Sequence, residues 1–510
     1  MTATIYSIIP PLLVLFCVLA TKRVILSISL GIVTSALLLH NFQIIDALQS
    51  IVQAVIGILY SDGEWNMGNV YLISFLFILG AITSFISASG GTEAFGEWAM
   101  KRVKSRRAAA LLTFILGIVI FIDDYFNALA VGQVSKPVTD RYGISRTKLA
   151  YFIDSTSAPI CVISPISSWG AYIIALLGTI FATYNVSDMS AFSGFLQLVP
   201  LNFYAVLSII MVVAVIYFNI NIGPMRKFEE IAMKQINSYN ETKKTTKSGS
   251  PKDLVYPILT LVAITFGMIF FTGLQGSEGD VSIFNIIENA NVNISLFVAS
   301  IIAVTVSIIR YTNGGGKEVT KQAKHGIGSM FGAVLILFFA WTLTDLISQI
   351  GTGSYLSALL QAINIQPSFL PVILFVIAGI MAFSTGTSWG TFGLMIPIGA
   401  QMAMELQPDL FLPSLAAVLA GAVFGDHCSP ISDTTILSST GAECNHIDHV
   451  TTQLPYAIIV AINAAIGFLL IGFTGNAILS FGITLAIFVV ILVILKLKYG
   501  ATEEEMKMAS

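Results

Sequence analysis

The stretch Gly425-Asp-His-Cys-Ser-Pro-Ile-Ser-Asp-Thr-Thr435 combines two carboxylates, several hydroxyls and a helix-breaking proline. It lies between two long apolar segments, and no Lys or Arg occurs between Lys324 and Lys496. A charge at the bilayer centre costs about 2.5–3.5 kcal/mol on insertion scales, and non-helical backbone there must be buried in protein or line a wet cavity. We therefore interpret the stretch as part of an ion or substrate site, with a polar surface loop as the alternative.

The composition indicates a membrane protein with little soluble mass. The chain has 510 residues, of which 55% are hydrophobic and 10% are charged, against about 25% charged in soluble domains. Apolar runs of about 20 residues recur from end to end, each long enough to cross a hydrocarbon core. We predict an all-α polytopic membrane protein. The four scattered cysteines suggest neither a disulfide framework nor a paired-cysteine metal site.

The basic residues predict the topology. The positive-inside rule places their clusters in the cytoplasm, and one arrangement satisfies all of them. This arrangement has the N-terminus outside, the C-terminus in the cytoplasm and about 11 full spans. The clusters are Lys22-Arg23, 101–107, 136–148, 226–252, 310–324 and 496–507.

Two segments predict re-entrant hairpins. Residues 108–138 begin and end beside basic clusters, and Phe121-Ile-Asp-Asp-Tyr-Phe-Asn127 lies at their middle. One long broken span is the alternative for this segment. Residues 367–404 form the second predicted hairpin, bent at Phe383-Ser-Thr-Gly-Thr-Ser-Trp-Gly390.

Two further segments predict broken spans. Residues 148–184 are too long for one straight span, and we expect interruptions at Asp154–Pro159 and again at Ser164–Ser168. Residues 412–445 are expected to form the second broken span, around the opening stretch.

An internal repeat orders these landmarks. Ser164-Pro-Ile-Ser167 recurs as Ser429-Pro-Ile-Ser432, and the two hairpin tips align at a similar offset. The charge topology gives the two copies opposite orientations, which is typical of secondary transporters with inverted repeats and broken helices. The predicted units are a first repeat (1–222), a cytoplasmic linker (223–253), an inverted second repeat (254–475), and an extra helix with a cytoplasmic tail (476–510).

Acidic residues at the breaks are the candidate ion carriers. A carboxylate can hold either a proton or a cation, and hydroxyls with unwound carbonyls can replace the water around the cation. Any of these acids could instead cap a half-helix, and Asp433, followed by two threonines, is the strongest single candidate. The predicted cation and proton ligands are Asp123, Asp124, Asp154, Ser155, Ser157, Asp426, Ser429, Asp433, Thr434 and Thr435.

A glycine- and hydroxyl-rich hairpin tip predicts contacts with a solute. Glycine allows close approach of backbone, and the N–H groups at a half-helix start suit a carboxylate. Tight helix packing through small residues is the alternative. The predicted solute-binding residues are Asn127, Ser384, Thr385, Gly386, Thr387, Ser388, Trp389 and His427, the last being either a proton carrier or a structural residue.

Glu443, Cys444, His446, Asp448 and His449 mimic a metal cluster. Zinc bound there would make the chain a membrane hydrolase or metalloenzyme. However, no paired cysteines frame the two histidines, so we interpret the segment as a solvated loop at a helix start. We predict no enzymatic activity and no metal site beyond Na⁺.

The opening stretch, continued to Ser439 and followed by His446-Ile-Asp-His-Val450 and Gln453-Leu-Pro-Tyr456, resembles the NhaC family of Na⁺/H⁺ antiporters. Phe121–Asn127 and Asp154-Ser-Thr-Ser-Ala-Pro159 are similar to its first-half motifs. The resemblance implies a secondary transporter of the bacterial inner membrane, with two re-entrant hairpins, an elevator movement and a homodimer in the lipid bilayer.

The resemblance implies no cofactor other than Na⁺ as transported or coupling ion, and no nucleic-acid partner. It leaves two functions open, because relatives of the family are similar to malate/lactate exchangers and others move amino acids. The first is Na⁺/H⁺ antiport. The second is Na⁺-coupled transport or exchange of an amino acid or a carboxylate. The absence of Lys and Arg from the second-half core argues mildly against a dicarboxylate as the solute.

Overall fold

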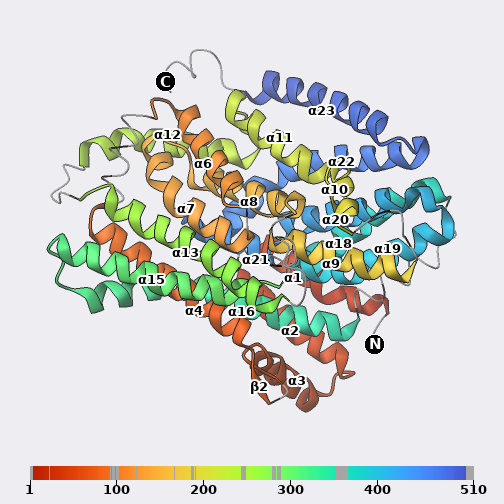
Figure 1. The fold of residues 1–510 in the computed structure, drawn as a ribbon, viewed down its shortest axis with the longest axis horizontal. Helices are drawn as coiled ribbons and strands as arrows, with labels where there is room; N and C mark the ends of the chain where they lie inside the picture. Colours follow the sequence, from red (N-terminus) through yellow and green to blue (C-terminus); the bar gives the residue numbers. More distant parts are fainter. Residues whose placement is uncertain are drawn as a thin grey trace.

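The computed structural model describes residues 4–21, 23–61, 63–91, 94, 98, 103–121, 123–165, 167–184, 186, 189, 191–242, 249–277, 283, 286, 289–351, 355 and 366–500. Figure 1 shows these residues as an almost entirely helical fold. The elements are η1 (Ile5–Ile8), α1 (Ile9–Thr21), α2 (Val24–Leu39), α3 (Ile44–Gly57), β1 (Tyr60–Ser61), β2 (Glu64–Trp65), α4 (Met67–Ala88), α6 (Arg106–Val119), α7 (Asp124–Arg141), α8 (Arg146–Ile163), α9 (Ser168–Thr183), α10 (Ala191–Leu198), α11 (Phe203–Phe218), α12 (Pro224–Thr242), α13 (Lys252–Gly276), α15 (Val292–Asn313), α16 (Val319–Ile350), η2 (Pro367–Phe369), α18 (Leu370–Thr385), α19 (Ser388–Leu406), η3 (Pro408–Leu410), α20 (Phe411–Cys428), α21 (Asp433–Gly441), α22 (His446–Thr474) and α23 (Ala477–Tyr499).

The apolar helices confirm an all-α membrane protein. Within the described ranges, seven helices are long and apolar enough to cross a membrane, or up to eight if α10 and α11, which meet at 46°, form one span. The predicted number of about 11 spans stays a prediction.

The helices pack in two groups. Helices α4, α13, α15 and α16 pack on one another, and α1, α2 and α3 join them along α2 and α16. Helices α6–α9, α11 and α18–α23 form the other group. In Figure 1 the first group lies along the lower side of the molecule, and the second fills the rest. The predicted site residues all belong to the second group.

The repeated Ser-Pro-Ile-Ser motif separates two helix pairs in the same way. Helices α8 and α20 each have 18 residues, and the residues that follow them, Ser164 and Ser429, have extended backbones. The next residue is proline, which disfavours helical backbone in the residue before it and has no N–H to donate. The last serine then caps the following half-helix, because Ser167 Oγ accepts from Gly170 N at 2.8 Å and Ser432 Oγ accepts from Thr435 N at 3.4 Å.

One predicted interruption is wrong, because α8 continues through Asp154–Pro159. The hydroxyls there do not compete with the helix. Thr156 Oγ1 donates to the Phe152 carbonyl at 2.7 Å and Ser157 Oγ donates to the Asp154 carbonyl at 3.2 Å. Such bonds to the preceding turn are compatible with helical backbone. The break at Ser164–Ser167 is present, and so is the predicted break in residues 412–445.

The two broken helices run antiparallel. At one end, Arg146 donates to Glu443 Oε2 at 3.0 Å. Arg146 is the first residue of α8, and Glu443 lies just beyond the end of α21. In the middle Ser155 Oγ lies 3.2 Å from His427 Nε2. At the other end the ring of Phe181 on α9 lies 6.0 Å from the ring of Phe411 at the start of α20.

Two helical hairpins bring their tips to these breaks. The Tyr142 hydroxyl after α7 donates to the Val103 carbonyl before α6, so the ends of α6 and α7 meet. This contact favours a hairpin over the alternative of one long broken span. In the second hairpin, Gly399 of α19 lies against Leu374 of α18.

Residues 224–242 of the predicted linker form helix α12. Figure 1 shows α12 beside α6, at the edge of the second group. Its residue Glu229 is buried, so the linker is packed onto the membrane helices in part.

Candidate functional site

The tip of the first hairpin presents two buried carboxylates. Asp123 Oδ1 accepts from Tyr125 N at 3.1 Å at the start of α7, which is the capping role expected as the alternative for these acids. Asp124 lies in the first turn of α7, and its Oδ1 accepts from the indole N–H of Trp169 at 3.0 Å. Trp169 follows the break in the α8–α9 pair, so the hairpin tip and the break are fixed to each other.

The second half presents two further carboxylates at its own break. Asp426, near the end of α20, accepts from Ser388 Oγ at 2.7 Å. Asp433, in the first turn of α21, accepts from Thr434 N at 2.9 Å and from the Tyr125 hydroxyl. Neither aspartate is a helix N-cap, because Asp426 lies near the end of α20 and Ser432 is the N-cap of α21.

These four acids form one carboxylate cluster, defined as Asp123, Asp124, Asp426 and Asp433. The charges of the other three act on Asp124, so the carboxylates repel one another when ionised. Asp124 and Asp426 are 2% and 1% exposed, and among the described residues Asp124 Oδ2 and Asp426 Oδ1 have no hydrogen-bond partner. Such oxygens are available to a ligand from outside the chain.

The hydroxyls of two other predicted cation ligands, Ser429 and Thr434, have partners within the protein, whereas that of Thr435 has none in the described chain. The hydroxyls of Ser432 and Thr434 lie 2.8 Å apart, and Ser429 Oγ donates to the Phe383 carbonyl at 2.8 Å. Thr435 Oγ1 is buried and has no partner within the described chain. In the described ranges, no three or more His, Cys, Asp or Glu side chains are arranged so that they could hold a metal ion by themselves. A cation at the cluster would therefore need hydroxyl or carbonyl oxygens as well as carboxylates.

Asp154 belongs to a second network, which includes His427 at the end of α20. Its Oδ2 accepts from Gln453 Nε2 at 2.6 Å and lies 3.2 Å from His449 Nε2 and 3.9 Å from His427 Nε2. His427 in turn lies 2.7 Å from the Tyr204 hydroxyl through Nδ1. The structure thus places Asp154 with buried histidines, together with Ser155, and its hydrogen-bond partners in the described chain are not members of the carboxylate cluster.

The predicted solute tip lies against the second break. Gly386 has φ +68°, and a side chain there would meet the Ile431 carbonyl at 2.6 Å, so only glycine fits. Ser388 reaches Asp426, whereas the hydroxyls of Ser384 and Thr385 donate to carbonyls of their own helix at 2.7 and 2.9 Å. The carbonyl of Thr387 accepts from Thr391 Oγ1 at 3.0 Å.

Two predicted solute residues have structural contacts. Asn127 Nδ2 donates to the carbonyls of Gly117 and Ile120 at 2.7 and 2.6 Å, so this side chain closes the first hairpin. Trp389 packs edge-on against Trp169 at 6.0 Å between ring centroids, which joins the second hairpin to the α9 start.

Sequence reasoning missed five residues of these two sites. The prediction of a solvated loop at 443–449 holds for Glu443, which is exposed, and is wrong for His446 and His449, which are buried. The sequence contains a signal for His449 and Gln453, because polar residues four positions apart lie next to each other on one face of a helix. The missed residues are Tyr125, Trp169, Tyr204, His449 and Gln453.

A different buried charge site lies where α12 docks. Glu229 Oε1 accepts from Ser145 N at 2.7 Å, and its Oε2 accepts from Lys148 Nζ at 3.1 Å and from Arg106. Burial by itself raises the pKa of Glu229, but the Lys148 and Arg106 cations and the Ser145 N–H bring the pKa of this carboxyl below its ordinary value. We call Glu229, Arg106, Lys148 and Ser145 the Glu229 clamp.

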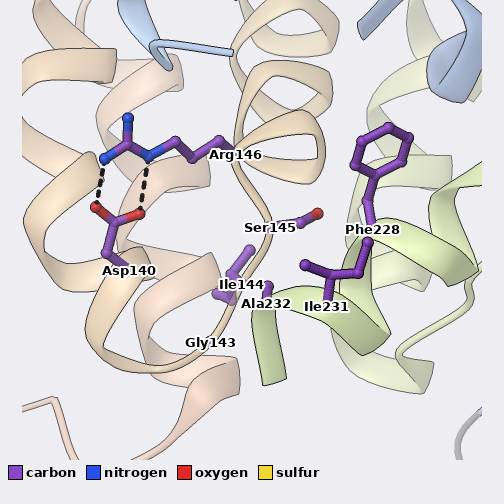
Figure 2. A pocket seen from close by; sticks show the side chains of 8 residues that line it. All are labelled: Asp140, Gly143, Ile144, Ser145, Arg146, Phe228, Ile231 and Ala232. Atoms are coloured by element: carbon purple, nitrogen blue, oxygen red, sulfur yellow. Dashed lines mark hydrogen bonds and ion pairs between the residues drawn. The ribbon is translucent and has the colours of Figure 1, made fainter. Parts of the chain in front are cut away.

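Beside the clamp, Figure 2 shows a pocket of about 310 Å³ between α12 and the turn that joins α7 to α8. Phe228, Ile231 and Ala232 line it from α12. Opposite them, Arg146 donates to Asp140 Oδ1 at 3.3 Å through Nε and to Oδ2 at 3.1 Å through Nη2. The lining contains no predicted site residue, so this pocket is distinct from the carboxylate cluster.

Comparison with known proteins assigns relatives to most of the chain. The profile of the Na⁺/H⁺ antiporter family matches residues 160–473. An uncharacterized protein of Haemophilus influenzae is 47% identical over 501 residues, 97% of this chain and 96% of its own length. The malate-2H⁺/Na⁺-lactate antiporter of Bacillus subtilis is 31% identical over 229 residues, 44% of this chain and 45% of its own. An uncharacterized Na⁺/H⁺ antiporter of Haemophilus influenzae is 37% identical over 101 residues, 19% of this chain and 21% of its own.

Proposed function

The chain belongs to the Na⁺/H⁺ antiporter family, and from this premise we propose that it exchanges Na⁺ for H⁺ by binding them in turn at the carboxylate cluster. Membership of the family makes it a secondary transporter, and its apolar helices make it a multi-pass membrane protein. The identity of the two exchanged ions and the residues that carry them are our proposal.

One observation supports the proposal most strongly. In the described part of the chain, no ion pair joins Asp124, Asp426 or Asp433 to a lysine, arginine or histidine. Neighbouring buried carboxylates without a cation are strongly unfavourable when all are ionised. The cluster is relieved either by taking up protons or by binding a cation, so the two compete for the same oxygens.

The residues then have distinct roles. Among the described residues, Asp124 Oδ2, Asp426 Oδ1 and the Thr435 hydroxyl on α21 have no hydrogen-bond partner. Asp433 is oriented by Tyr125 and by its own helix start. The Ser388 hydroxyl orients Asp426. The oxygens of Asp124 and Asp426 would hold Na⁺ or H⁺, and protonation of the carboxylates would release the cation.

The proposal includes the setting in the bacterial inner membrane. The antiparallel broken helices support two repeats of opposite orientation, which in such transporters expose a central site to each side in turn. We propose that the basic ends of the helices face the cytoplasm, that the chain forms a homodimer, and that the second helix group moves against the first as an elevator.

Purified protein in liposomes with an internal pH dye tests the exchange. A Na⁺ gradient without any organic solute should drive proton movement, and Asp433→Asn should reduce it to the level of empty liposomes. Asp345→Asn is the matched control, because Asp345 is exposed on α16 and accepts from Gln349 of its own helix at 2.8 Å. Full exchange by the Asp433→Asn protein would contradict the assignment of the cluster.

A second candidate is exchange of a small organic acid. Similarity to the malate-2H⁺/Na⁺-lactate antiporter over 229 residues supports it, and so does the position of the second hairpin tip beside Asp426. A liposome that is silent to Na⁺ alone but moves protons when lactate or malate is added would favour this candidate over simple Na⁺/H⁺ exchange.

A further inference from the structure

A cavity of about 560 Å³ lies at the boundary between the two helix groups, away from the carboxylate cluster. Helices α4 and α16 line one side, and α7 lines the other with Gln133, Lys136 and Asp140. A second cavity of about 640 Å³ shares Thr83, Ser329 and Glu443 with it, so the two adjoin. We call the first the α4–α7 cavity; its volume falls in the usual range of small-molecule sites.

Gln133 is the unusual residue of this cavity. Its side chain is 7% exposed, and its amide nitrogen Nε2 has no hydrogen-bond acceptor among the described residues. A buried amide donor without an acceptor is unfavourable, because it loses its bonds to water and gains none in return. An acceptor supplied by a bound solute would remove this cost.

A second donor lies one helical turn further on the same face. Lys136 follows Gln133 by three residues on α7, a spacing that places side chains next to each other. The Lys136 ammonium bonds to Glu443, and an ammonium has three donors, so it can bind a further acceptor. Arg146 also lines the cavity, and Figure 2 shows its guanidinium held by Asp140.

On the side of the cavity that α4 and α16 line, a hydroxyl already has a partner. Ser84 Oγ on α4 donates to Gln322 Oε1 on α16 at 3.2 Å, which ties the two lining helices together. The charges of Lys136 and Arg146 are balanced by those of Asp140 and Glu443. What the lining lacks is an acceptor for Gln133, and a carboxylate provides strong acceptors for neutral and cationic donors together.

We propose that the α4–α7 cavity binds the carboxylate group of a small organic solute through Gln133 Nε2 and Lys136 Nζ. The site goes beyond the ion exchange proposed above, because it shares no residue with the carboxylate cluster. Gln133 lies nine residues beyond Asp124 on α7, about 14 Å along the helix. Solute and ion sites are therefore carried by one helix.

Isothermal titration of the purified full chain with lactate, succinate and alanine tests the site, with lactamide as the uncharged analogue of lactate. We expect binding by at least one carboxylate compound and none by lactamide. Gln133→Met keeps the length of the side chain and removes the donor, so binding should weaken about tenfold. Gln53→Met, on the exposed face of α3, is the matched control and should bind as the unaltered protein does.

The outcomes separate the sources of the carboxylate. Binding of alanine alone assigns the site to zwitterionic solutes, and binding of lactate or succinate assigns it to simple acids; both support the proposal. Equal binding by lactamide, no binding by any compound, or an unchanged affinity in Gln133→Met overturns it. If Gln133→Met does not fold, Lys136→Met provides the same comparison. Na⁺-driven proton flux is measured separately, so failure of this site does not decide the ion exchange.

Discussion

The carboxylate cluster and the Glu229 clamp are both buried charge sites, but they are built in opposite ways. The clamp sets one acid, Glu229, against the cations of Arg106 and Lys148, and Lys148 also donates to Asn219 and Asn221 at 2.8 Å each. The cluster gathers four acids, and two of their oxygens have no partner in the described chain.

This difference in pairing indicates that the clamp serves stability and that the cluster serves the proposed transport function. A buried charge that is fully paired holds elements in place, and loss of one partner leaves the other uncompensated. A buried charge without a partner in the protein is costly and is retained where a mobile ligand completes the site. The clamp therefore fastens α12 to the membrane helices, whereas the cluster is the site at which we propose that an ion from solution binds.

Neutralising the cluster should give the largest functional effect. Asp426→Asn keeps an oxygen that can accept from Ser388 but removes the charge, so Na⁺-driven proton flux should fall to background. The thermal midpoint in Na⁺-free buffer should stay the same or rise, because repulsion among the carboxylates is relieved. Loss of both flux and midpoint would show that the acid is structural, and would break the comparison.

Neutralising the clamp should have the opposite signature. Glu229→Gln leaves Arg106 and Lys148 without their carboxylate, and the free energy of unfolding should fall by about 3–5 kcal/mol. Chemical or thermal unfolding in detergent measures this change, and flux per folded protein should persist. Glu230→Gln is the control, since Glu230 is an exposed neighbour paired with Arg226 across one helical turn. A similar loss in both variants would mean that burial of Glu229 contributes nothing.

The clamp also predicts a pH dependence. The pKa of Glu229 is lower in the folded protein than its ordinary value of 4.5, because the cations outweigh burial. An acid with a lowered folded pKa contributes stability that is complete above the unfolded pKa and is lost as pH falls through the folded pKa. The difference in thermal midpoint between the unaltered protein and Glu229→Gln should therefore be constant near neutral pH and shrink below about pH 4.5. A difference that grows on acidification would contradict the assigned direction.

The sequence predicted the parts of the fold that local chemistry determines. Proline after an extended serine, with a second serine as the next cap, is a local signal, and both Ser-Pro-Ile-Ser breaks are present. The interruption predicted at Asp154–Pro159 is wrong because polar residues in a helix can bond to their own preceding turn. Composition does not distinguish that arrangement from a break.

The site was predictable only in part, because it forms by contacts between distant segments. The acids at the breaks were identified, yet Asp154 pairs with His449 and Gln453, nearly three hundred residues away, and not with the cluster. The Glu229 clamp was not predicted at all. Its acid lies in a segment whose Lys, Glu, Ser and Thr content is typical of a linker, and only docking of α12 reveals its partners.

Glu443 provides the smallest effect and the sharpest test of what burial contributes. Like Glu229, it bonds to two cations, Lys136 and Arg146, but its side chain is 43% exposed. Partial burial alone raises the pKa of Glu443, and the two cations bring it below the ordinary value, so the direction matches that of Glu229. Water screens an exposed pair, and Glu443→Gln should lower the free energy of unfolding by only about 0–1 kcal/mol. Unfolding of Glu443→Gln beside Glu229→Gln measures the contrast. If the two variants lost equal stability, the number of cations rather than their burial would distinguish a fastening site from a binding site.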